Sequence, residues 1–305
     1  MKKIILAGGS GYIGRILVDF YSEKVDEVIV LTRGAALING NVRFVHWNGK
    51  DVGSWTKEME NADLLVNLTG KNVNCRYNQR NKDEILNSRI NATAALGKAV
   101  SQLATPPSVW IQSASATIYR HAEDRSMDEE TGEIGDGFSV EVCKAWEKSF
   151  WEQKTPHTRK VLLRIGIVLG KSDSALPRLL SLTRLGLGGK QGSGRQYMSW
   201  IHEEDVASVI NWVYTHEEIT GTFNCTSPQP LPNADFMSTL RKACKVPFGI
   251  PMPALLLKAG ALIIGTETEL ILKSRWVVPK KLIDAGYVFQ FADLRSALKD
   301  IIRNE

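Results

Sequence analysis

KIILAGGSGYIG, residues 3–14, is the stretch that decides the fold of this chain. Its apolar first half is typical of a β-strand buried on both sides, and its second half has a glycine at every third position from Gly8 to Gly14. Glycines at this spacing let the backbone turn tightly and approach a pyrophosphate, which the amide groups and positive dipole of the next helix attract. The stretch therefore predicts a dinucleotide-binding turn, with a glycine turn that binds nothing as the alternative. The predicted contact residues are Gly8, Ser10, Gly11, Tyr12, Ile13 and Gly14.

Short apolar runs and longer helical patterns alternate through the first 170 residues. The predicted strands cover residues 3–7, 27–31, 43–47, 63–68, 108–113 and 160–168. The predicted helices cover residues 13–22, 80–102 and 140–153. This alternation is typical of an α/β fold. Right-handed crossovers make it a doubly wound parallel sheet of the Rossmann type, with helices on both faces.

The second half of the chain changes character after Gly170, because glycine is frequent in residues 185–194 and six prolines lie between Pro228 and Pro253. Such residues mark loops and short elements. We expect a smaller C-terminal, substrate-side subdomain at the carboxyl edge of the sheet, where ligands of open α/β sheets bind. The predicted division assigns residues 1–170 and 196–226 to the dinucleotide-binding domain, and residues 171–195 and 227–305 to the subdomain.

The composition limits the classes of partner. The 305 residues contain 38 Lys and Arg against 33 Asp and Glu, without a long basic run, so no nucleic-acid partner is expected. The four cysteines form no Cys-x-x-Cys pair and the five histidines show no ligand spacing, so we expect no metal site. The apolar run after the first three residues is too short for a signal peptide. The longest apolar stretch, residues 254–264, is shorter than a membrane span of roughly 20 residues. We expect a cytoplasmic protein without a membrane partner, and the oligomeric state stays open.

The end of the second predicted strand indicates which dinucleotide is bound. An acidic residue about 20 positions after the glycines usually holds the ribose 2′-hydroxyl, but this chain has Thr32 and Arg33 there. The hydroxyl of Thr32 and the planar cation of Arg33 suit a 2′-phosphate, so we predict NADP(H). An ordinary solvated arginine is the alternative.

Several motifs together resemble those of the short-chain dehydrogenase/reductase superfamily, in its extended NAD-dependent epimerase/dehydratase form. More narrowly, the chain resembles the atypical subfamily labelled epimerase or cell-division-inhibitor-like. The matching stretches are GGSGYIG at 8–14, LTR at 31–33, NLTG at 67–70, EVCKAWE at 141–147, RIGIVLG at 164–170 and WIH at 200–202. The family also has a C-terminal segment of unknown role, which resembles residues 251–302.

The resemblance implies further cofactor contacts. Residues Leu68, Thr69 and Gly70 would lie against the adenosine ribose and the diphosphate. Arg89, with Glu84 upstream, would face the cofactor, although an ordinary surface cation is an equal alternative for Arg89. Val168 would border the nicotinamide pocket.

The resemblance also implies a reaction centre. The superfamily uses a Tyr-x-x-x-Lys pair on one helix for acid–base chemistry and a serine on the preceding strand to bind the substrate oxygen. Ser115 matches the serine and Lys144 matches the lysine, but the residue four positions before Lys144 is Val140, which cannot transfer a proton.

Another group would therefore have to transfer the proton. Tyr119, four residues after Ser115, is the first candidate, and a buried tyrosine with a satisfied hydroxyl is the favoured alternative. Glu141, His202 and Asp205 are weaker candidates, and Asp205 is more simply explained as the N-cap of an apolar helix.

Three kinds of function remain open. The first is an NADP(H)-binding oxidoreductase or epimerase that acts on a carbonyl or hydroxyl group of a small polar substrate, such as a nucleotide sugar. The second is a non-catalytic regulatory module that senses NADP(H), which the missing tyrosine suggests. A third, a structural protein with a vestigial turn, predicts no dinucleotide binding at all.

Overall fold

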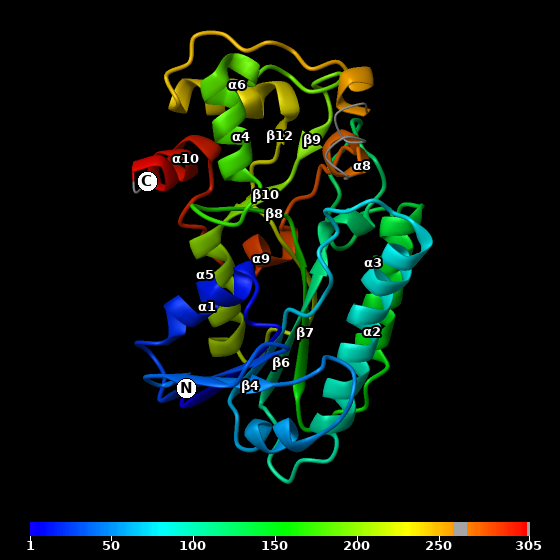
Figure 1. Ribbon diagram of the computed structural model, residues 1–305, viewed down its shortest axis with the longest axis vertical. Coiled ribbons are helices and arrows are strands. Elements are labelled where there is room, and N and C mark those ends of the chain that lie inside the picture. The colour runs from blue at the N-terminus through cyan, green and yellow to red at the C-terminus, as the bar shows by residue number, and fades with distance from the viewer. Residues whose placement is uncertain (259–266, 304–305) are drawn as a thin grey trace.

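The computed structural model describes residues 1–258 and 267–303, and an eight-stranded sheet forms its centre (Figure 1). Its strand order is β11-β7-β6-β5-β1-β2-β4-β3, and every neighbouring pair is parallel except β3 with β4. The strands are β1 (Lys3–Ala7), β2 (Glu27–Thr32), β3 (Leu37–Asn39), β4 (Val42–His46), β5 (Leu64–Asn67), β6 (Val109–Ser115), β7 (Arg159–Ile165) and β11 (Gly221–Cys225). The chain reverses its direction of progress between β1 and β5, and ligands of such sheets bind at that point.

Two layers of helices cover the sheet. Ile4 and Leu6 of β1 pack on the side of α1 (Tyr12–Tyr21) and α5 (Glu203–Thr215). Ile5 and Ala7 pack on the other side, in one cluster with residues of α2 (Gln79–Val100) and α3 (Phe138–Trp151). Successive side chains of a strand point to opposite faces, so a strand that is apolar at every position builds two cores. The predicted α/β, doubly wound Rossmann class is confirmed.

The differences from the predicted elements have local causes. The predicted strand at residues 160–168 is two strands, β7 and β8 (Ile167–Leu169), which Gly166 separates. A Cβ atom at Gly166 would lie 2.9 Å from the carbonyl oxygen of Ser199, so the chain bends there against a neighbouring segment. Strand β3 was not predicted, because all three of its residues are exposed and carry no burial pattern.

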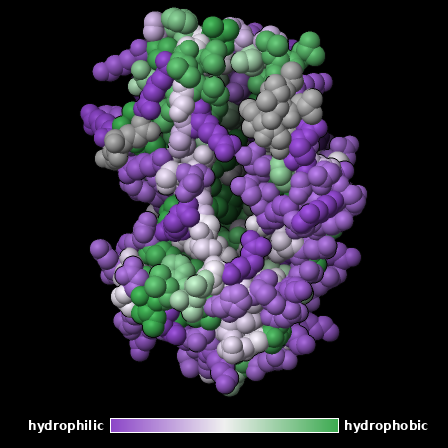
Figure 2. Space-filling model, in the orientation of Figure 1, coloured by the Kyte–Doolittle hydropathy of each residue, from purple (hydrophilic) through white to green (hydrophobic). Residues whose placement is uncertain are grey.

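A smaller core lies beyond the carboxyl edge of the sheet. Leu176, Trp200, Phe236, Leu240 and Leu298 belong to it. Its elements are α4 (Leu176–Leu182), the π-helix η3 (Thr183–Leu187), β9 (Tyr197–Met198), β10 (Trp200–His202), β12 (Leu231–Pro232), α6 (Asn233–Ala243) and α10 (Leu294–Arg303). On the face drawn in Figure 2, apolar side chains gather at this end of the molecule.

Part of the C-terminal region returns to the main sheet. Leu282, in α9 (Lys280–Asp284), and Tyr287 belong to the core on the α1 and α5 side of the sheet. The predicted division placed these residues in the subdomain, so the C-terminal region is shared between two cores. The remaining short elements are the 3₁₀ helices η1 (Ser54–Met59) and η2 (Ala116–Ile118), and α8 (Glu269–Leu272).

Within the described ranges, none of the helices is both long and apolar enough to span a bilayer. The same residues hold no group of three or more His, Cys, Asp and Glu side chains arranged for a metal ion. Residues 259–264 of the apolar stretch at 254–264 lie outside the described residues.

Candidate functional site

The glycine turn joins β1 to α1 at the carboxyl edge of the sheet. Gly8 has a φ of +75° and donates its N–H to the carbonyl oxygen of Leu31 at 2.9 Å. A Cβ atom at Gly14 would lie 2.2 Å from the carbonyl oxygen of Gly9, so this close approach of helix and turn requires glycine. Gly11 is the N-cap of α1 and makes no side-chain cap, which leaves the first-turn amides of a ten-residue helix without a side-chain acceptor. This arrangement fits a pyrophosphate.

The end of β2 lies beside the turn. The Thr32 hydroxyl donates to Oγ of Ser10 at 3.1 Å and accepts the N–H of Gly34 at 3.2 Å. Arg33 is exposed, and in the described part of the chain its guanidinium has no hydrogen-bond or ion-pair partner. Its cation is therefore available to an anionic ligand at the edge of the turn.

Tyr12 and Ile13 open α1. The Tyr12 hydroxyl donates to Oε2 of Glu203 at 2.8 Å, and burial, together with this carboxylate, raises the pKa of Tyr12. Ile13 is partly buried against the main core. Tyr12 thus joins α1 to the start of α5, and its contribution to a cofactor site would come from its position beside the turn.

The predicted residues after β5 lie next to the glycines. The Leu68 N–H donates to the carbonyl oxygen of Ala7 at 2.8 Å. A Cβ atom at Gly8 would lie 3.1 Å from Cα of Thr69, so the two turns touch. Asn67 holds the second turn, because its Oδ1 accepts the N–H of Thr69 at 3.1 Å and the hydroxyl of Thr69 at 2.6 Å.

Arg89 is partly buried and held by hydrogen bonds, unlike an ordinary solvated surface cation. Its NH1 donates to the carbonyl oxygens of Lys71 at 3.1 Å and Ile85 at 2.8 Å, and its guanidinium lies 4.9 Å from the ring centre of Trp146. Burial lowers the pKa of Arg89. A Cβ atom at Gly70 would lie 2.9 Å from its Cζ, so Arg89 reaches the turn after β5.

Glu84 interacts with other residues than Arg89 does. Its carboxylate forms ion pairs with Lys71 and Arg80, and the hydrogen bond from Lys71 is the main cause that lowers the pKa of Glu84. The two residues that the resemblance paired therefore have different surroundings.

A cavity of about 120 Å³ lies at the end of β6. Ser115 and Arg89 both line it, together with Tyr77, Ser139 and Cys143. Oγ of Ser115 accepts the N–H of Thr117 at 3.2 Å, which leaves the Ser115 hydroxyl proton free to be donated elsewhere. The structure thus brings together the hydroxyl of Ser115, the partly buried cation of Arg89 and the first turns of α3.

Five residues of α3 line this cavity, and two of them, Ser139 and Cys143, are four positions apart. Val140 is fully buried in a cluster with Tyr119 and Cys143, and it does not line the cavity. The Lys144 side chain is half exposed, pairs with Glu141 at 2.9 Å, and does not line the cavity. One residue along an α-helix is a rotation of about 100°, so the pair one position earlier points to the site while Lys144 points outward.

Cys143 is a neutral thiol in this setting. Burial raises its pKa to about 12, and the positive charges of Arg89, Lys273 and Arg275 oppose that rise. The thiol is thus protonated at neutral pH and suits neither base nor nucleophile chemistry.

Tyr119 is buried and its hydroxyl is satisfied. It donates to Oδ1 of Asn224 at 3.0 Å and accepts from NH1 of Arg164 at 2.7 Å, while Arg164 also donates twice to the Glu147 carboxylate at 2.8 Å. Burial raises the pKa of Tyr119. Tyr119 does not line the 120 Å³ cavity, which supports the structural alternative.

The remaining predicted residues lie around β10 and α5. Val168 pairs with Ile201 and packs on the main core, outside the lining of the 120 Å³ cavity. The interpretation of Asp205 as an N-cap is wrong, because His202 caps α5 by accepting the N–H of Glu204 at 3.2 Å. Asp205 is instead fully buried and accepts the N–H groups of Gln290 and Phe291, both at 2.9 Å.

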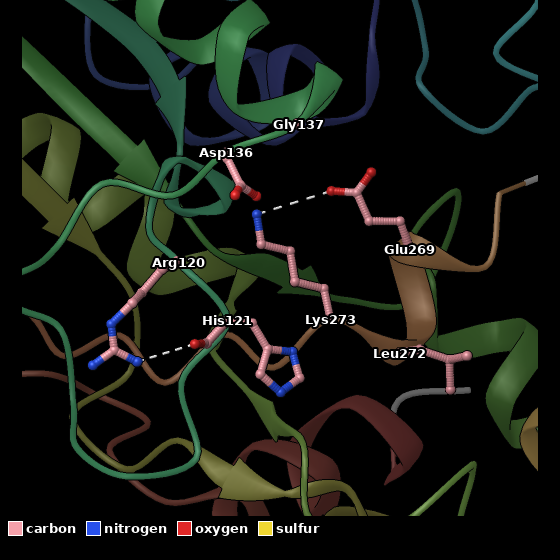
Figure 3. A pocket seen from close by; sticks show the side chains of 7 residues that line it. All are labelled: Arg120, His121, Asp136, Gly137, Glu269, Leu272 and Lys273. Carbon is pink, nitrogen blue, oxygen red and sulfur yellow. Dashed lines mark hydrogen bonds and ion pairs between the residues drawn. The ribbon is translucent and has the colours of Figure 1, made fainter.

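The C-terminal segment supplies site residues that sequence reasoning missed. Figure 3 shows a second cavity, of about 420 Å³, into which the Lys273 side chain extends toward the carboxylates of Asp136 and Glu269. Nζ of Lys273 donates to the carbonyl oxygen of Thr117 at 3.0 Å and lies 3.9 Å from Oε1 of Glu269. Burial lowers the pKa of Lys273.

Two contacts join this second cavity to the first. The Ser139 hydroxyl donates to Oε2 of Glu269 at 3.0 Å, and Nζ of Lys273 donates to the carbonyl oxygen of Thr117 at 3.0 Å. Ser139 and Thr117 both line the smaller cavity. No local motif marks these C-terminal residues, because they come together with Ser139 and Thr117 through the tertiary fold.

Comparison with known proteins agrees with this geometry. The model of the NAD dependent epimerase/dehydratase family matches residues 4–226, and that of a domain of unknown function (DUF1731) matches residues 252–301. Epimerase family protein YfhF of Bacillus subtilis is 30% identical over 98% of this chain and 97% of its own length. Epimerase family protein SDR39U1 of Mus musculus is 31% identical over 98% of this chain and 99% of its own length.

Solved structures show the same fold. The human epimerase family protein SDR39U1, crystallised with NADPH, has a TM-score of 0.88 and 28% identity, and the match covers 99% of this chain and 100% of that chain. A nucleoside-diphosphate sugar epimerase from Corynebacterium glutamicum has a TM-score of 0.78 and 25% identity, over 100% of this chain and 59% of that chain. The resemblance found in the motifs is confirmed: the chain belongs to the NAD dependent epimerase/dehydratase family and carries the DUF1731 domain at its C-terminal end.

Proposed function

We propose that this protein is an NADP(H)-dependent oxidoreductase that acts on a carbonyl or hydroxyl group of a small polar substrate, with a nucleotide sugar as the favoured class. One observation carries the proposal: the uncapped start of α1, the exposed Arg33 and the Ser115 cavity all lie at the carboxyl edge of the sheet. The NADPH in the human SDR39U1 crystal and the name of the Corynebacterium protein support the choice of cofactor and substrate class.

The residues of the turn fit the cofactor. Gly11 and the first turn of α1 would hold the pyrophosphate, Arg33 would hold the 2′-phosphate, and Thr69 and Arg89 would lie along the remainder. When bound, NADP(H) supplies or accepts a hydride at its nicotinamide ring.

Ser115 would orient the substrate. Its Oγ already accepts from Thr117, so its proton can be donated to a substrate carbonyl oxygen. Such a bond polarises the carbonyl group and stabilises the negative charge that develops on the oxygen.

Two side chains are candidate proton donors to that oxygen: Tyr77, which lines the 120 Å³ cavity, and Lys273, which lines the neighbouring 420 Å³ cavity. Burial raises the pKa of Tyr77, away from neutrality, whereas burial lowers the pKa of Lys273, toward neutrality. General acid–base catalysis is most efficient when the pKa lies near the operating pH, so Lys273 is the favoured proton donor. Glu269, which contacts both Lys273 and Ser139, would hold the ammonium group in place.

Thermal unfolding with NADPH, with NADH and without ligand tests the cofactor. A ligand at 100 times its Kd adds about 2.7 kcal/mol of stability. We expect a larger shift with NADPH than with NADH, and Arg33→Ala reduces the NADPH shift. Arg295→Ala, on the exposed side of α10, is the matched control and leaves the shift unchanged. Equal shifts with both dinucleotides would contradict the NADP(H) preference, and no shift with either would contradict dinucleotide binding.

A second candidate is a non-catalytic module that senses NADP(H). It rests on Ser139 and Cys143 of α3, which line the cavity at the positions next to Val140 and Lys144, because the protonated Cys143 thiol does not suit acid–base chemistry. It predicts different hydrogen-exchange maps for the complexes with NADPH and NADP⁺. Identical maps would contradict sensing, and turnover of a carbonyl substrate would favour the enzyme.

A further inference from the structure

Two segments of the subdomain contain basic residues and no acidic ones. Residues 174–202 hold four Lys and Arg and residues 236–258 hold another four, and neither segment contains Asp or Glu. The whole chain carries 38 Lys and Arg against 33 Asp and Glu, so its total charge of +5 conceals a strongly basic region. Charge that is segregated in this way creates a local positive potential.

The fold joins the two segments into one surface. Ile250 donates its N–H to the carbonyl oxygen of Gly186 at 2.8 Å, and Met252 donates to that of Lys190 at 2.9 Å. NH1 of Arg241 donates to the carbonyl oxygen of Gly188 at 2.6 Å. This surface lies at the end of the molecule that carries α4 and α6, at the top of Figure 1.

Large apolar side chains are exposed on the same surface. Leu185 is 74% exposed, Phe248 is 64% exposed and Leu255 is 77% exposed. A Cβ atom at Gly186 would lie 3.1 Å from the ring of Phe248, so the two segments present their apolar side chains side by side. The exposed apolar residues of this surface are Leu182, Leu185, Phe248, Ile250, Leu255 and Leu256.

We propose that this surface, here named the basic apolar face, binds a membrane surface that carries anionic lipids. Its exposed cations are Arg178, Arg184, Lys190, Lys242, Lys245 and Lys258. Apolar side chains that enter the headgroup region and Lys or Arg side chains that pair with anionic headgroups together produce interfacial binding. The sequence-based expectation of no membrane partner rested on the length of the apolar stretches, and that length does not measure a local surface.

The composition of the face favours lipid over protein. The three most exposed apolar residues of the face are two leucines and a phenylalanine. Four of its six exposed cations are lysine. Lysine is depleted at protein–protein interfaces, whereas polybasic segments are attracted to anionic leaflets. A second copy of the same face would bring like charges together, which disfavours self-association.

Vesicle flotation of the full chain tests the proposal. We expect the protein to float with vesicles of phosphatidylcholine and phosphatidylserine but not with phosphatidylcholine alone. Binding at about 0.1 M salt is lost at about 1 M salt, because the screening length falls from about 10 Å to about 3 Å. Absence of binding to the anionic vesicles at the lower salt would overturn the proposal.

Paired variants assign the binding to the face. Lys242→Glu with Lys245→Glu, and separately Leu185→Ser with Leu255→Ser, each abolish flotation. The matched controls, Lys57→Glu with Lys98→Glu and Ile38→Ser with Val288→Ser, change equally exposed residues elsewhere and keep it. Thermal unfolding checks that every variant is folded.

Three further results would overturn the proposal. Equal loss of flotation in the control variants would show general charge attraction. Concentration-dependent dimers in sedimentation, lost in Leu185→Ser, would assign the face to a second copy. Binding to a polyglutamate peptide without vesicle binding would assign it to an acidic protein partner.

Discussion

Nζ of Lys273 donates a hydrogen bond to the carbonyl oxygen of Thr117 at 3.0 Å, across 156 residues of sequence. Thr117 follows Ser115 by two positions, so this contact places a lysine of the C-terminal domain at the end of β6. Glu269 makes a second contact of this kind, because it accepts a hydrogen bond from the hydroxyl of Ser139 on α3. The DUF1731 domain therefore contributes side chains to the wall of the 420 Å³ cavity.

Lys273→Met is expected to slow NADPH-dependent reduction of a carbonyl substrate by about 10²- to 10⁴-fold, the usual contribution of a general acid. Because a general acid must be protonated, the wild-type rate falls as the pH rises through the lowered pKa of Lys273. Single-turnover absorbance of NADPH measures both effects. Lys144→Met is the control, since Lys144 points to solvent, and an unchanged rate in Lys273→Met would refute the assigned role.

Substitution of two glycines separates cofactor binding from folding. At Gly11 a Cβ atom would meet its nearest neighbour at 3.5 Å, an ordinary contact, whereas at Gly14 it would lie 2.2 Å from backbone. Gly11→Ala is expected to keep the stability of the free protein but lose the thermal shift with NADPH. Gly14→Ala is expected to lose about 1–3 kcal/mol of stability, as overpacked cores do. Thermal unfolding with and without NADPH measures both, and a normal NADPH shift in Gly11→Ala would contradict pyrophosphate binding at the start of α1.

Asp205→Ala is expected to detach the C-terminal region from α5. The substitution leaves the N–H groups of Gln290 and Phe291 without their acceptor, at a cost of about 1–3 kcal/mol for each amide that stays buried. Hydrogen exchange of these two amides should accelerate, and urea unfolding should show the lower stability. Asp19→Ala, at an exposed position of α1, is the control. Unchanged exchange at residues 290 and 291 would show that the carboxylate does not hold the segment.

The lowered pKa of His202 leads us to expect that the free energy of unfolding falls in mild acid. Burial lowers its pKa from 6.5 to about 4, so the folded protein holds it neutral. Between pH 6.5 and 4 the unfolded chain binds more protons than the folded one, and the free energy of unfolding falls as the pH is lowered through this range. The loss is on the order of 3 kcal/mol at most. Urea unfolding of the wild type and His202→Asn at pH 7 and pH 4.5 measures it, and an equal loss in both proteins would place the cause elsewhere.

Local patterns predicted the elements near the glycine turn. The strand at 3–7 has the bounds predicted for it, and α1 begins one residue earlier than predicted. The apolar run and the glycine spacing act over a few residues, and neighbouring segments do not change what they require. Thr69 and Arg89 could be associated with the turn only through the family resemblance, since the contacts at Gly8 and Gly70 join separate strands and helices.

Residue types alone could not predict which side of α3 points to the cavity. Lys144 is the chemical match to the family's lysine, and counting back from it gives Val140. The rotation of α3 is set by tertiary packing, in which Val140 is fully buried while Ser139 and Cys143 line the cavity. The satisfied hydroxyl of Tyr119 likewise depends on Asn224 and Arg164, which lie on other strands.

The sequence by itself determined the doubly wound sheet and the phosphate-binding turn, because strand periodicity and glycine sterics act within a few residues. Only the tertiary structure decided which side chains meet at the reaction site. Lys273, Glu269, Ser139 and Thr117 come from three distant parts of the chain, and no spacing rule relates them. The burial that shifts the pKa of Lys273 also exists only after these parts have packed together.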